Sequence, residues 1–358
     1  MDSRGPLTGL RVVEFEGIGP APHCAMLFAD MGADVLRIAR PGGNGWPNPV
    51  MDRGRAIRTL DLAMTDGRAE AAEIVALADV LIEGFRPGVM ERLGLGPDPM
   101  LRANPRLVYG RLTGWGQQGA LAKTAGHDIT YMAMSGALAA MGKAGEPPVP
   151  PLNLVGDFGG GSPYLAFGIV AALWERERSG RGQVVDAAIL DGVASMMAMF
   201  MGFLPAGLIS LDREENFLGG AAPYYRCYRC ADGRDIAVGA IEPHFWRILC
   251  ERLGAPASIS QERSAWAETI AWFERTFAGQ PADHWVSLFE GSDACVAPVL
   301  TLVEAQGHAH HRSRGTFVNE DGAIQPAPAP RFGRTPGMIG PSRDAATLLA
   351  GWRSEPAR

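Results

Sequence analysis

The sequence has few cysteines and no excess of positive charge. Its five cysteines are scattered and odd in number, which argues against a disulfide framework. A reducing compartment is the simpler interpretation, so we expect a cytoplasmic protein. The formal net charge of -6 does not fit the basic surface of a general nucleic-acid binder, so no nucleic-acid partner is expected. Any anionic ligand must therefore be met by local basic residues.

Signals for targeting or membrane insertion are also weak. No basic stretch followed by an apolar run precedes the first strand-like segment at residues 10–15, so no signal peptide is expected. Residues 192–211 carry no charge and are long enough to cross a bilayer. However, Pro205 and three glycines interrupt this stretch, and Asp191 precedes it without basic neighbours. We therefore expect it to pack against protein and expect no membrane partner.

Several signatures of known chemistries are missing. There is no Gly-x-Ser-x-Gly elbow and no P-loop lysine, which argues against a serine hydrolase or a nucleoside triphosphatase. Cys227 and Cys230 form a single pair without a second one. The histidines at 308, 310 and 311 have no carboxylate at ligand spacing. No metal site is expected.

What the sequence does contain is an alternation of strand-like and helix-like segments. Apolar runs predict strands at 10–15, 34–40, 79–84, 106–114 and 183–189. Between them, helices are predicted at 23–31, 66–78 and 163–178. This alternation predicts an α/β fold with a large doubly wound, Rossmann-like domain on a parallel sheet.

A change of character after the charge-free stretch predicts a second domain. A hairpin is indicated around residues 231–234, followed by helices at 244–253 and 262–278 and a strand at 294–300. We expect a smaller α+β domain at 225–310, a linker at 190–224, and a large domain at 1–189. A C-terminal segment, 311–358, is expected to return to the large domain.

Basic residues follow the second predicted strand, where a ligand phosphate could bind. Gly17 and Gly19 lack the third glycine of a dinucleotide fingerprint. Where an NAD enzyme has an acid for the ribose hydroxyl, this chain has Arg37 and Arg40, which suit a ribose phosphate. Both NADP and the 3′-phosphoadenosine of coenzyme A are compatible. Further arginines that could add charge are Arg53, Arg55, Arg58, Arg86 and Arg92.

Two segments share one design, an ionisable residue before an apolar helix. The first is GHDITY at 126–131, which contains His127 and Asp128, and the second surrounds Asp157 at 153–162. Helix capping is the ordinary role of such residues. The three glycines after Asp157 are costly in a helix but useful where a backbone approaches a ligand closely, which favours a functional role.

Glu242 is a third candidate. It lies between the predicted hairpin and a helix whose first position Pro243 would occupy. Taken alone it is expected to cap that helix or face solvent. If it meets His127 in space, it could orient the imidazole.

Several motifs together resemble one enzyme family. They are GHDITY (126–131), PLNLVGDFGGGS (151–162), GRGQVVDAAILDG (180–192), APYY (222–225), ADGRDIAVGAIEP (231–243) and SDACVAPVL (292–300). In this order they closely resemble the α-methylacyl-CoA racemases, which belong to the class III, formyl-CoA transferase-like, CoA-transferase superfamily. The likeness runs from about residue 6 to PAPRF at 328–332. One departure is Gly219–Pro223, where the family usually has Asp-Gly-Gly-Ala-Pro.

The resemblance implies a fold, a reaction and a set of site residues. It implies an interlocked homodimer and a racemase that interconverts (R)- and (S)-2-methylacyl-CoA thioesters of branched-chain fatty acids in lipid metabolism. His127 and Asp157 would be the acid/base pair, assisted by Glu242, with Asp128 as the expected source of the donor to the enolate oxygen. No cofactor is expected, since coenzyme A is part of the substrate. Coenzyme A would contact Arg40, Thr59, Leu60, Asp61, Leu62, Gly84, Phe85, Arg86, Arg92, Gly126, His127, Asp128, Ile129, Thr130 and Tyr131.

Two other functions stay open at this point. In a class III CoA-transferase, the same Asp157 would be a nucleophile that forms an acyl anhydride. His127 separates the two hypotheses, because a transferase needs no second base at the α-carbon, and relatives of that branch commonly have tyrosine there. In a non-catalytic module that binds coenzyme A or NADP, both aspartates would be helix caps.

Overall fold

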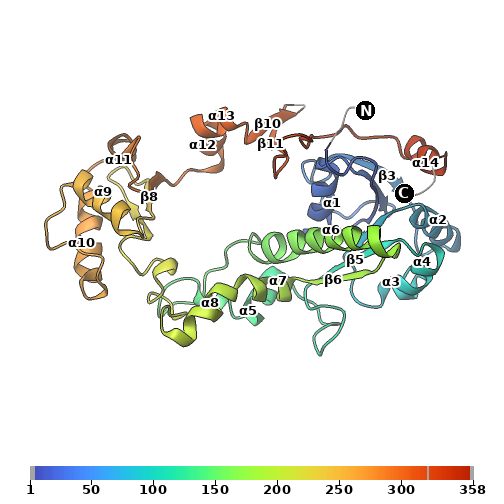
Figure 1. Ribbon diagram of the computed structural model, residues 1–358, viewed down its shortest axis with the longest axis horizontal. Helices are drawn as coiled ribbons and strands as arrows, with labels where there is room; N and C mark the ends of the chain where they lie inside the picture. The colour runs from blue at the N-terminus through green and yellow to red at the C-terminus, as the bar shows by residue number, and fades with distance from the viewer. Residues whose placement is uncertain (1–4, 321, 355–358) are drawn as a thin grey trace. The chain divides into compact units, whose positions relative to one another are not determined.

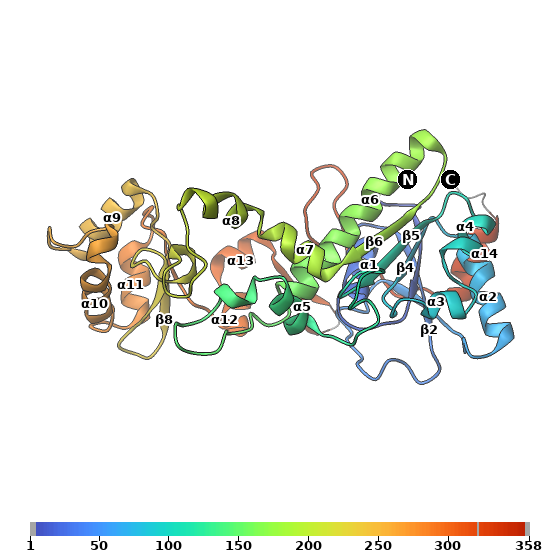
Figure 2. The ribbon, with the colours of Figure 1, turned by 90° about the horizontal axis from the view of Figure 1, so that it is seen from below.

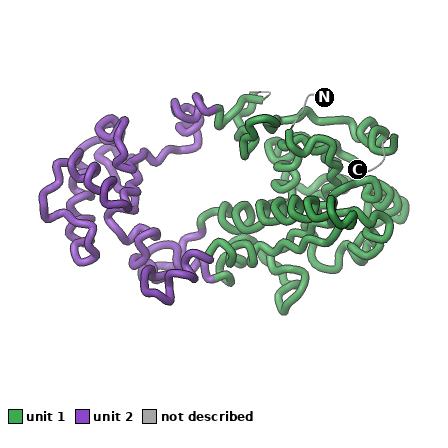
Figure 3. Tube along the Cα trace, in the orientation of Figure 1, with its two compact units in different colours: residues 1–135, 151–197, 315–358 green, residues 136–150, 198–314 purple. Residues whose placement is uncertain are grey.

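The computed structural model describes residues 5–320 and 322–354, and the chain forms two compact units. Unit 1 contains the chain up to Ser135, then Pro151–Met197 and the part from Gly315 onward; unit 2 contains Gly136–Pro150 and Ala198–Arg314 (Figure 3). These ranges differ from the sequence prediction, which placed 136–150 in the large domain and began the linker at 190. The linker begins later than predicted because the strand Val184–Ala188 runs directly into the helix Ile189–Met196, which packs within unit 1.

Unit 1 is built on a six-stranded parallel sheet with the order β3-β2-β1-β4-β5-β6. The strands are β1 (Arg11–Phe15), β2 (Asp34–Ala39), β3 (Arg55–Thr59), β4 (Val80–Glu83), β5 (Val108–Thr113) and β6 (Val184–Ala188). Strands such as β1 are buried throughout, as expected when helices cover both faces of a sheet. The predicted α/β fold with a parallel sheet is confirmed. This strand order is that of a doubly wound fold, with its reversal between β1 and β4.

Strand β3 was not predicted. Its sequence, RAIRT, carries two arginines, and only its first two residues are buried. It pairs with β2 at the edge of the sheet, so it lacks the continuous apolar run that marks the central strands.

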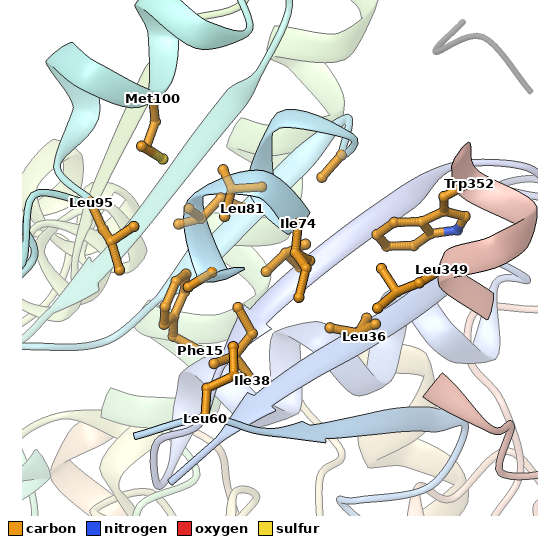
Figure 4. Packing of buried hydrophobic residues seen from close by; sticks show 14 of the residues in the cluster. Phe15, Leu36, Ile38, Leu60, Ile74, Leu81, Leu95, Met100, Leu349 and Trp352 are labelled. Atoms are coloured by element: carbon orange, nitrogen blue, oxygen red, sulfur yellow. The ribbon is translucent and has the colours of Figure 1, made fainter. Parts of the chain in front are cut away.

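Helices pack on both faces of this sheet (Figures 1 and 2). Unit 1 contains the helices α1 (Pro20–Asp30), α2 (Thr65–Ala76), α3 (Val89–Arg92), α4 (Pro97–Ala103), α5 (Asp128–Met134), α6 (Ser162–Ser179), α7 (Ile189–Met196) and α14 (Ala345–Ser354). Figure 4 shows how the C-terminal helix α14 joins the core, with Leu349 and Trp352 beside Leu36 of β2. Burial of each such side chain stabilises the fold by about 2–3 kcal/mol. A hairpin, β10 (Phe317–Glu320) with β11 (Ala323–Pro326), also belongs to this unit.

Unit 2 has a core of its own. The predicted hairpin is confirmed as β7 (Arg226–Arg229) and β8 (Asp235–Val238), and β9 (Val296–Pro298) completes an antiparallel sheet. Tyr228 of β7 packs against Phe273 and Phe277. The principal helices are α9 (Pro243–Leu253), α10 (Trp266–Phe277) and the unpredicted α11 (Ala282–Phe289); shorter ones are α8 (Ala198–Phe203), α12 (Leu302–Gly307) and α13 (Ala309–Arg314).

Among the described residues, no single helix has both the length and the apolar character needed to cross a bilayer. One pair of consecutive helical stretches, Ile189–Met196 and Ala198–Ala206, passes by combined length and composition, with a bend of 45° between them.

Candidate active site

A cavity of about 880 Å³ lies in unit 1 beyond the carboxyl ends of the central strands. Residues 17–22, 84–87 and 112–115, which follow or end β1, β4 and β5, contribute to its lining. The sheet reverses its order between β1 and β4, and doubly wound folds bind ligands at such a reversal. His127, Asp128 and Asp157 also line this cavity, so the fold brings together the three predicted chemical residues of the large domain.

His127 occupies the N-cap position of α5. The side chain of Thr130 satisfies the backbone of His127 with two hydrogen bonds. The Thr130 hydroxyl oxygen accepts one from the His127 N–H at 3.0 Å, and the hydroxyl donates the other to the His127 carbonyl oxygen at 2.7 Å. The extended backbone of His127 is typical of an N-cap residue. The side chain of His127 is exposed.

Asp157 lies in a single π-helical turn, η2 (Gly156–Gly161), which leads directly into α6. Turns of this kind occur frequently at functional sites. Burial raises the pKa of the Asp157 carboxyl; the amide of Asn153 and the charge of His127 oppose this rise, and the negative charge of Asp128 adds to it. The carboxyl group is therefore easier to protonate than an ordinary aspartate.

The glycines of η2 approach protein rather than a ligand. A side chain at Gly160 would come within 2.8 Å of the backbone nitrogen of Val193 in α7, and one at Gly161 within 3.1 Å of Ile189. On the opposing helix, a side chain at Gly192 would overlap the backbone carbonyl of Gly160. Gly160 and Gly192 therefore let η2 and α7 pack backbone against backbone, a role that the sequence reasoning did not foresee, and the ligand explanation for the three glycines stays a prediction.

Asp128 reaches from α5 to η2. Its side-chain oxygen Oδ2 accepts a hydrogen bond from the backbone N–H of Asp157 at 2.7 Å. Burial raises the pKa of Asp128, while the amide groups of Asp157 and Gly156 oppose that rise. The Asp128 carboxylate thus accepts a hydrogen bond in this structure. That Asp128 supplies the donor to an enolate oxygen stays a prediction.

The predicted coenzyme A contacts fall into three groups. Gly84, Phe85, Arg86, Gly126 and Tyr131 line the cavity with His127 and Asp128. Arg40 and Thr59–Leu62 follow β2 and β3 side by side, since the Leu60 N–H donates to the Ala39 carbonyl at 2.9 Å. Arg92, Ile129 and Thr130 are exposed and are not among the described residues that line the cavity.

Most of the other arginines proposed for phosphate binding have internal partners. Arg37 is buried and pairs with Glu14 at 3.0 Å and Asp52 at 2.6 Å. Arg55 pairs with Glu14, and Arg53 with Asp30. Burial in these ion pairs keeps all three guanidinium groups away from a ligand, so the phosphate role suggested for Arg37, Arg53 and Arg55 was wrong. On the surface, Arg58 pairs with Glu70 at 2.6 Å.

Arg40, in contrast, keeps a side chain that is 65% exposed, with Glu16 4.0 Å away.

Glu242 belongs to unit 2. It is exposed and occupies the N-cap position of α9, directly before Pro243, but its side chain makes no capping hydrogen bond, so of the two ordinary roles the solvent-facing one agrees with the structure. Its predicted encounter with His127 stays a prediction. Among the described residues, no group of three or more His, Cys, Asp or Glu side chains forms a metal-ion arrangement.

Sequence reasoning missed part of the cavity wall. Trp46 lines the cavity although it is 75% exposed, and Ile18, which is 55% exposed, does the same. Trp46 stands in a segment rich in glycine, proline and asparagine, and an isolated aromatic residue in such a loop is the signal that could have identified it. His23, which is not among the described residues that line the cavity, was also missed; its Nδ1 lies 2.7 Å from the Oγ of Ser162, at the start of α6.

Comparisons with known proteins agree on one family. A sequence model of CoA-transferase family III matches residues 7–344. The α-methylacyl-CoA racemase of Mus musculus is 46% identical over 342 residues, which are 94% of this chain and 89% of the relative. The α-methylacyl-CoA racemase of Homo sapiens is 43% identical, with the same coverage. The acetyl-CoA:oxalate CoA-transferase of Acetobacter aceti is 29% identical, covering 90% of this chain and 88% of its own.

Solved structures confirm the fold. A CAIB/BAIF family protein from Brucella suis has a TM-score of 0.84 at 24% identity and covers 98% of this chain and 100% of its own. Rv3272 from Mycobacterium tuberculosis, in its orthorhombic form, has a TM-score of 0.79 at 26% identity and covers 97% and 99%.

Proposed function

Because the chain belongs to CoA-transferase family III, we propose that it is an α-methylacyl-CoA racemase that interconverts (R)- and (S)-2-methylacyl-CoA thioesters. The observation that carries this proposal is the cavity that His127 and Asp157 share, in a chain closely similar to two racemases. A transferase needs an acyl-accepting carboxylate, but it has no need of a second base beside it.

The reaction is a 1,1-proton transfer. One residue of the pair, in its unprotonated form, removes the α-proton from one face of the carbon, and the bond's electrons move toward the thioester oxygen as an enolate. The other residue, in its protonated form, delivers a proton to the opposite face. The pair ends with its proton exchanged between the two residues, so one protonated and one unprotonated member are needed at all times.

The environment of Asp157 supports this requirement. Burial raises its pKa, and the nearby charge of Asp128 acts in the same direction. A raised pKa makes the protonated form of Asp157 easier to reach than that of an ordinary aspartate, and an acid in this reaction needs that form. The charge of His127 opposes the shift, as expected for a pair that shares one proton.

For coenzyme A, we propose contacts with the exposed Arg40, with the backbone of Thr59–Leu62, with Gly84–Arg86, and with Gly126–Tyr131. Arg92 is the remaining proposed cation. Exposure of Arg40 and the position of Arg86 in the cavity lining support this assignment. Leu60 is buried, so its contribution would come from the backbone. Glu242 is proposed to assist His127, and no separate cofactor takes part.

We also propose that the chain forms an interlocked homodimer. Helix α6 carries an exposed apolar stripe in which Phe167 is 74%, Trp174 67% and Tyr164 36% exposed. Apolar stripes of this size rarely face water in a monomer. Sedimentation equilibrium at micromolar concentration tests this: a single species at the monomer mass would contradict the dimer. A cytoplasmic location is proposed as well, in keeping with five free thiols.

Deuterium exchange tests the reaction. The protein is incubated in D₂O with one epimer of a 2-methylacyl-CoA, and NMR follows deuterium at the α-carbon and loss of stereochemical purity. We expect both to proceed together. His127→Ala and Asp157→Asn should each lower racemisation by a factor of about 10²–10⁴ while still exchanging the α-proton of one epimer, a different one in each variant.

The competing outcomes are distinct. Transfer of coenzyme A to a free acid, without deuterium at the α-carbon, would support the CoA-transferase alternative with Asp157 as nucleophile. Binding of the thioester without either reaction would leave a binding module. Wild-type racemisation by His127→Ala would contradict the assignment of the pair.

A further inference from the structure

Asp128 makes a contact that its place in α5 does not explain. A carboxylate in the first turn of a helix usually faces the N–H groups of that helix or water. Here the residue is buried, only 9% exposed, and its Oδ2 accepts the backbone N–H of Asp157, 29 residues further along the chain. The Gly156 amide interacts favourably with the same carboxylate.

The turn opposite Asp128 is shaped to receive the carboxylate. A side chain at Gly156 would overlap the Asp128 carboxylate, so only glycine permits the approach. Gly156 is itself buried. The carboxylate and the glycine are therefore two halves of one close contact between α5 and η2.

We propose that Asp128 is a positioning residue, which fastens the backbone of Asp157 to the start of α5 and so sets the separation between the two side chains that transfer the proton. The inference rests on the proposed function for the roles of His127 and Asp157. Asp128 follows His127 directly in the chain and is joined to Asp157 by a hydrogen bond. A single side chain thus connects both partners. A displacement of about 1 Å between reacting groups costs about 100-fold in rate.

The charge of Asp128 gives this contact a second, measurable effect. The negative charge of Asp128 raises the pKa of Asp157. Two further residues of the same segment interact with Asp157: the charge of His127 opposes that rise, while burial and the charge of Asp157 raise the pKa of Tyr131. From the other elements packed on η2, α1 brings His23 against Phe158 and α7 brings the exposed Asp191. Loss of the Asp128 charge must therefore lower the pKa of Asp157 and move the acidic limb of the pH–rate profile to lower pH.

Two substitutions separate the contact from the charge. Asp128→Asn removes the charge and keeps an oxygen that can accept the Asp157 N–H; Asp128→Ala removes both. For Asp128→Ala we expect kcat for epimerisation to fall about 100-fold, with a much smaller change in KM for the acyl-CoA. For Asp128→Asn we expect a smaller fall, about tenfold, and the shifted acidic limb. The matched control is Asp98→Asn, an exposed first-turn acid of α4, which should change neither.

A second measurement does not depend on catalysis. Amide hydrogen exchange at Asp157 should be slow in the unmodified protein, slightly faster in Asp128→Asn, and much faster in Asp128→Ala, with Asp98→Asn like the unmodified protein. Fast exchange at Asp157 in the unmodified protein, or an Asp128→Asn variant with unchanged kcat and acidic limb, would overturn the proposal. If the unmodified protein does not racemise but the exchange pattern holds, the proposed function fails while the contact stands.

Discussion

Helices α5 and α6 look alike in sequence and begin differently in the structure. Each is an apolar helix preceded by an ionisable residue, His127 in one and Asp157 in the other. The N-terminus of α5 is capped within four residues, because the Thr130 hydroxyl makes hydrogen bonds with the backbone N–H and the carbonyl of His127. The start of α6 is held by partners from elsewhere: Asp128 contacts η2, and His23 contacts Ser162.

This difference means that the N-termini of α5 and α6 depend on different kinds of contact. The cap of α5 is formed by residues that are close in sequence, so it depends little on tertiary contacts, and the position of His127 is set locally. The π-turn of η2, in contrast, is held by tertiary contacts, including its backbone packing on α7. The position of Asp157 is therefore a property of the whole unit. Substitutions far from Asp157 in sequence should move it, whereas His127 should respond mainly to near neighbours.

The largest expected effect comes from Gly192→Ala in α7. The added methyl group would meet the backbone carbonyl of Gly160, which cannot rotate away, so η2 must shift. Overpacking against backbone costs about 2–3 kcal/mol. We expect the free energy of unfolding in urea to fall by that amount and kcat to fall with it. Gly202→Ala in α8 is the control, since nothing lies within 4 Å of the added atom there; equal losses in both variants would contradict this packing.

A smaller effect is expected from Thr130→Val. The variant keeps the shape of the side chain but removes the hydroxyl that closes α5, and loss of such a cap costs about 1 kcal/mol. Urea unfolding should show this loss, and amide exchange at Asp157 should stay as it is in the unmodified protein. The control is Thr276→Val in α10, where the hydroxyl donates to the Trp272 carbonyl of its own helix. Faster amide exchange at Asp157 in Thr130→Val would contradict this prediction, because it would show that the cap of α5 also stabilises the start of α6.

The same distinction explains what the sequence could predict of the fold. Central strands were predicted because burial on both faces of the sheet leaves continuous apolar runs. The long helix α6 was predicted from its apolar run and charged end, and Gly180 ends it with a left-handed backbone. The edge strand β3 and the helix α11 were missed. Half-exposed β3 has only two apolar residues, which stand between two arginines, and its pairing with β2 cannot be read from five residues alone.

Within the site, local patterns identified residues but not their partners. His127 and Asp157 were singled out from their places before helices. What the sequence could not supply was the contact between Asp128 and the backbone of Asp157, or the reason for the glycines of η2. Likewise Arg37 looked like a phosphate ligand until its burial against Glu14 was known. Long-range partners decide such roles, and one sequence does not reveal them.

The smallest expected effect concerns pH and His23, which contacts the start of α6. Burial lowers the pKa of His23 below 6.5, and the charges of Arg55 and Arg53 lower it further. In the unfolded chain the imidazole therefore binds a proton more readily, so the stability of the folded protein falls as the pH drops through 6.5 toward the folded pKa. His23→Gln, which can still bond the Ser162 hydroxyl, should flatten that fall and cost at most about 1 kcal/mol at neutral pH. Urea midpoints at pH 5, 6 and 7 measure the slope, with His284→Gln of α11 as control. An unchanged slope in His23→Gln would mean that the contact between His23 and Ser162 does not make the start of α6 sensitive to pH.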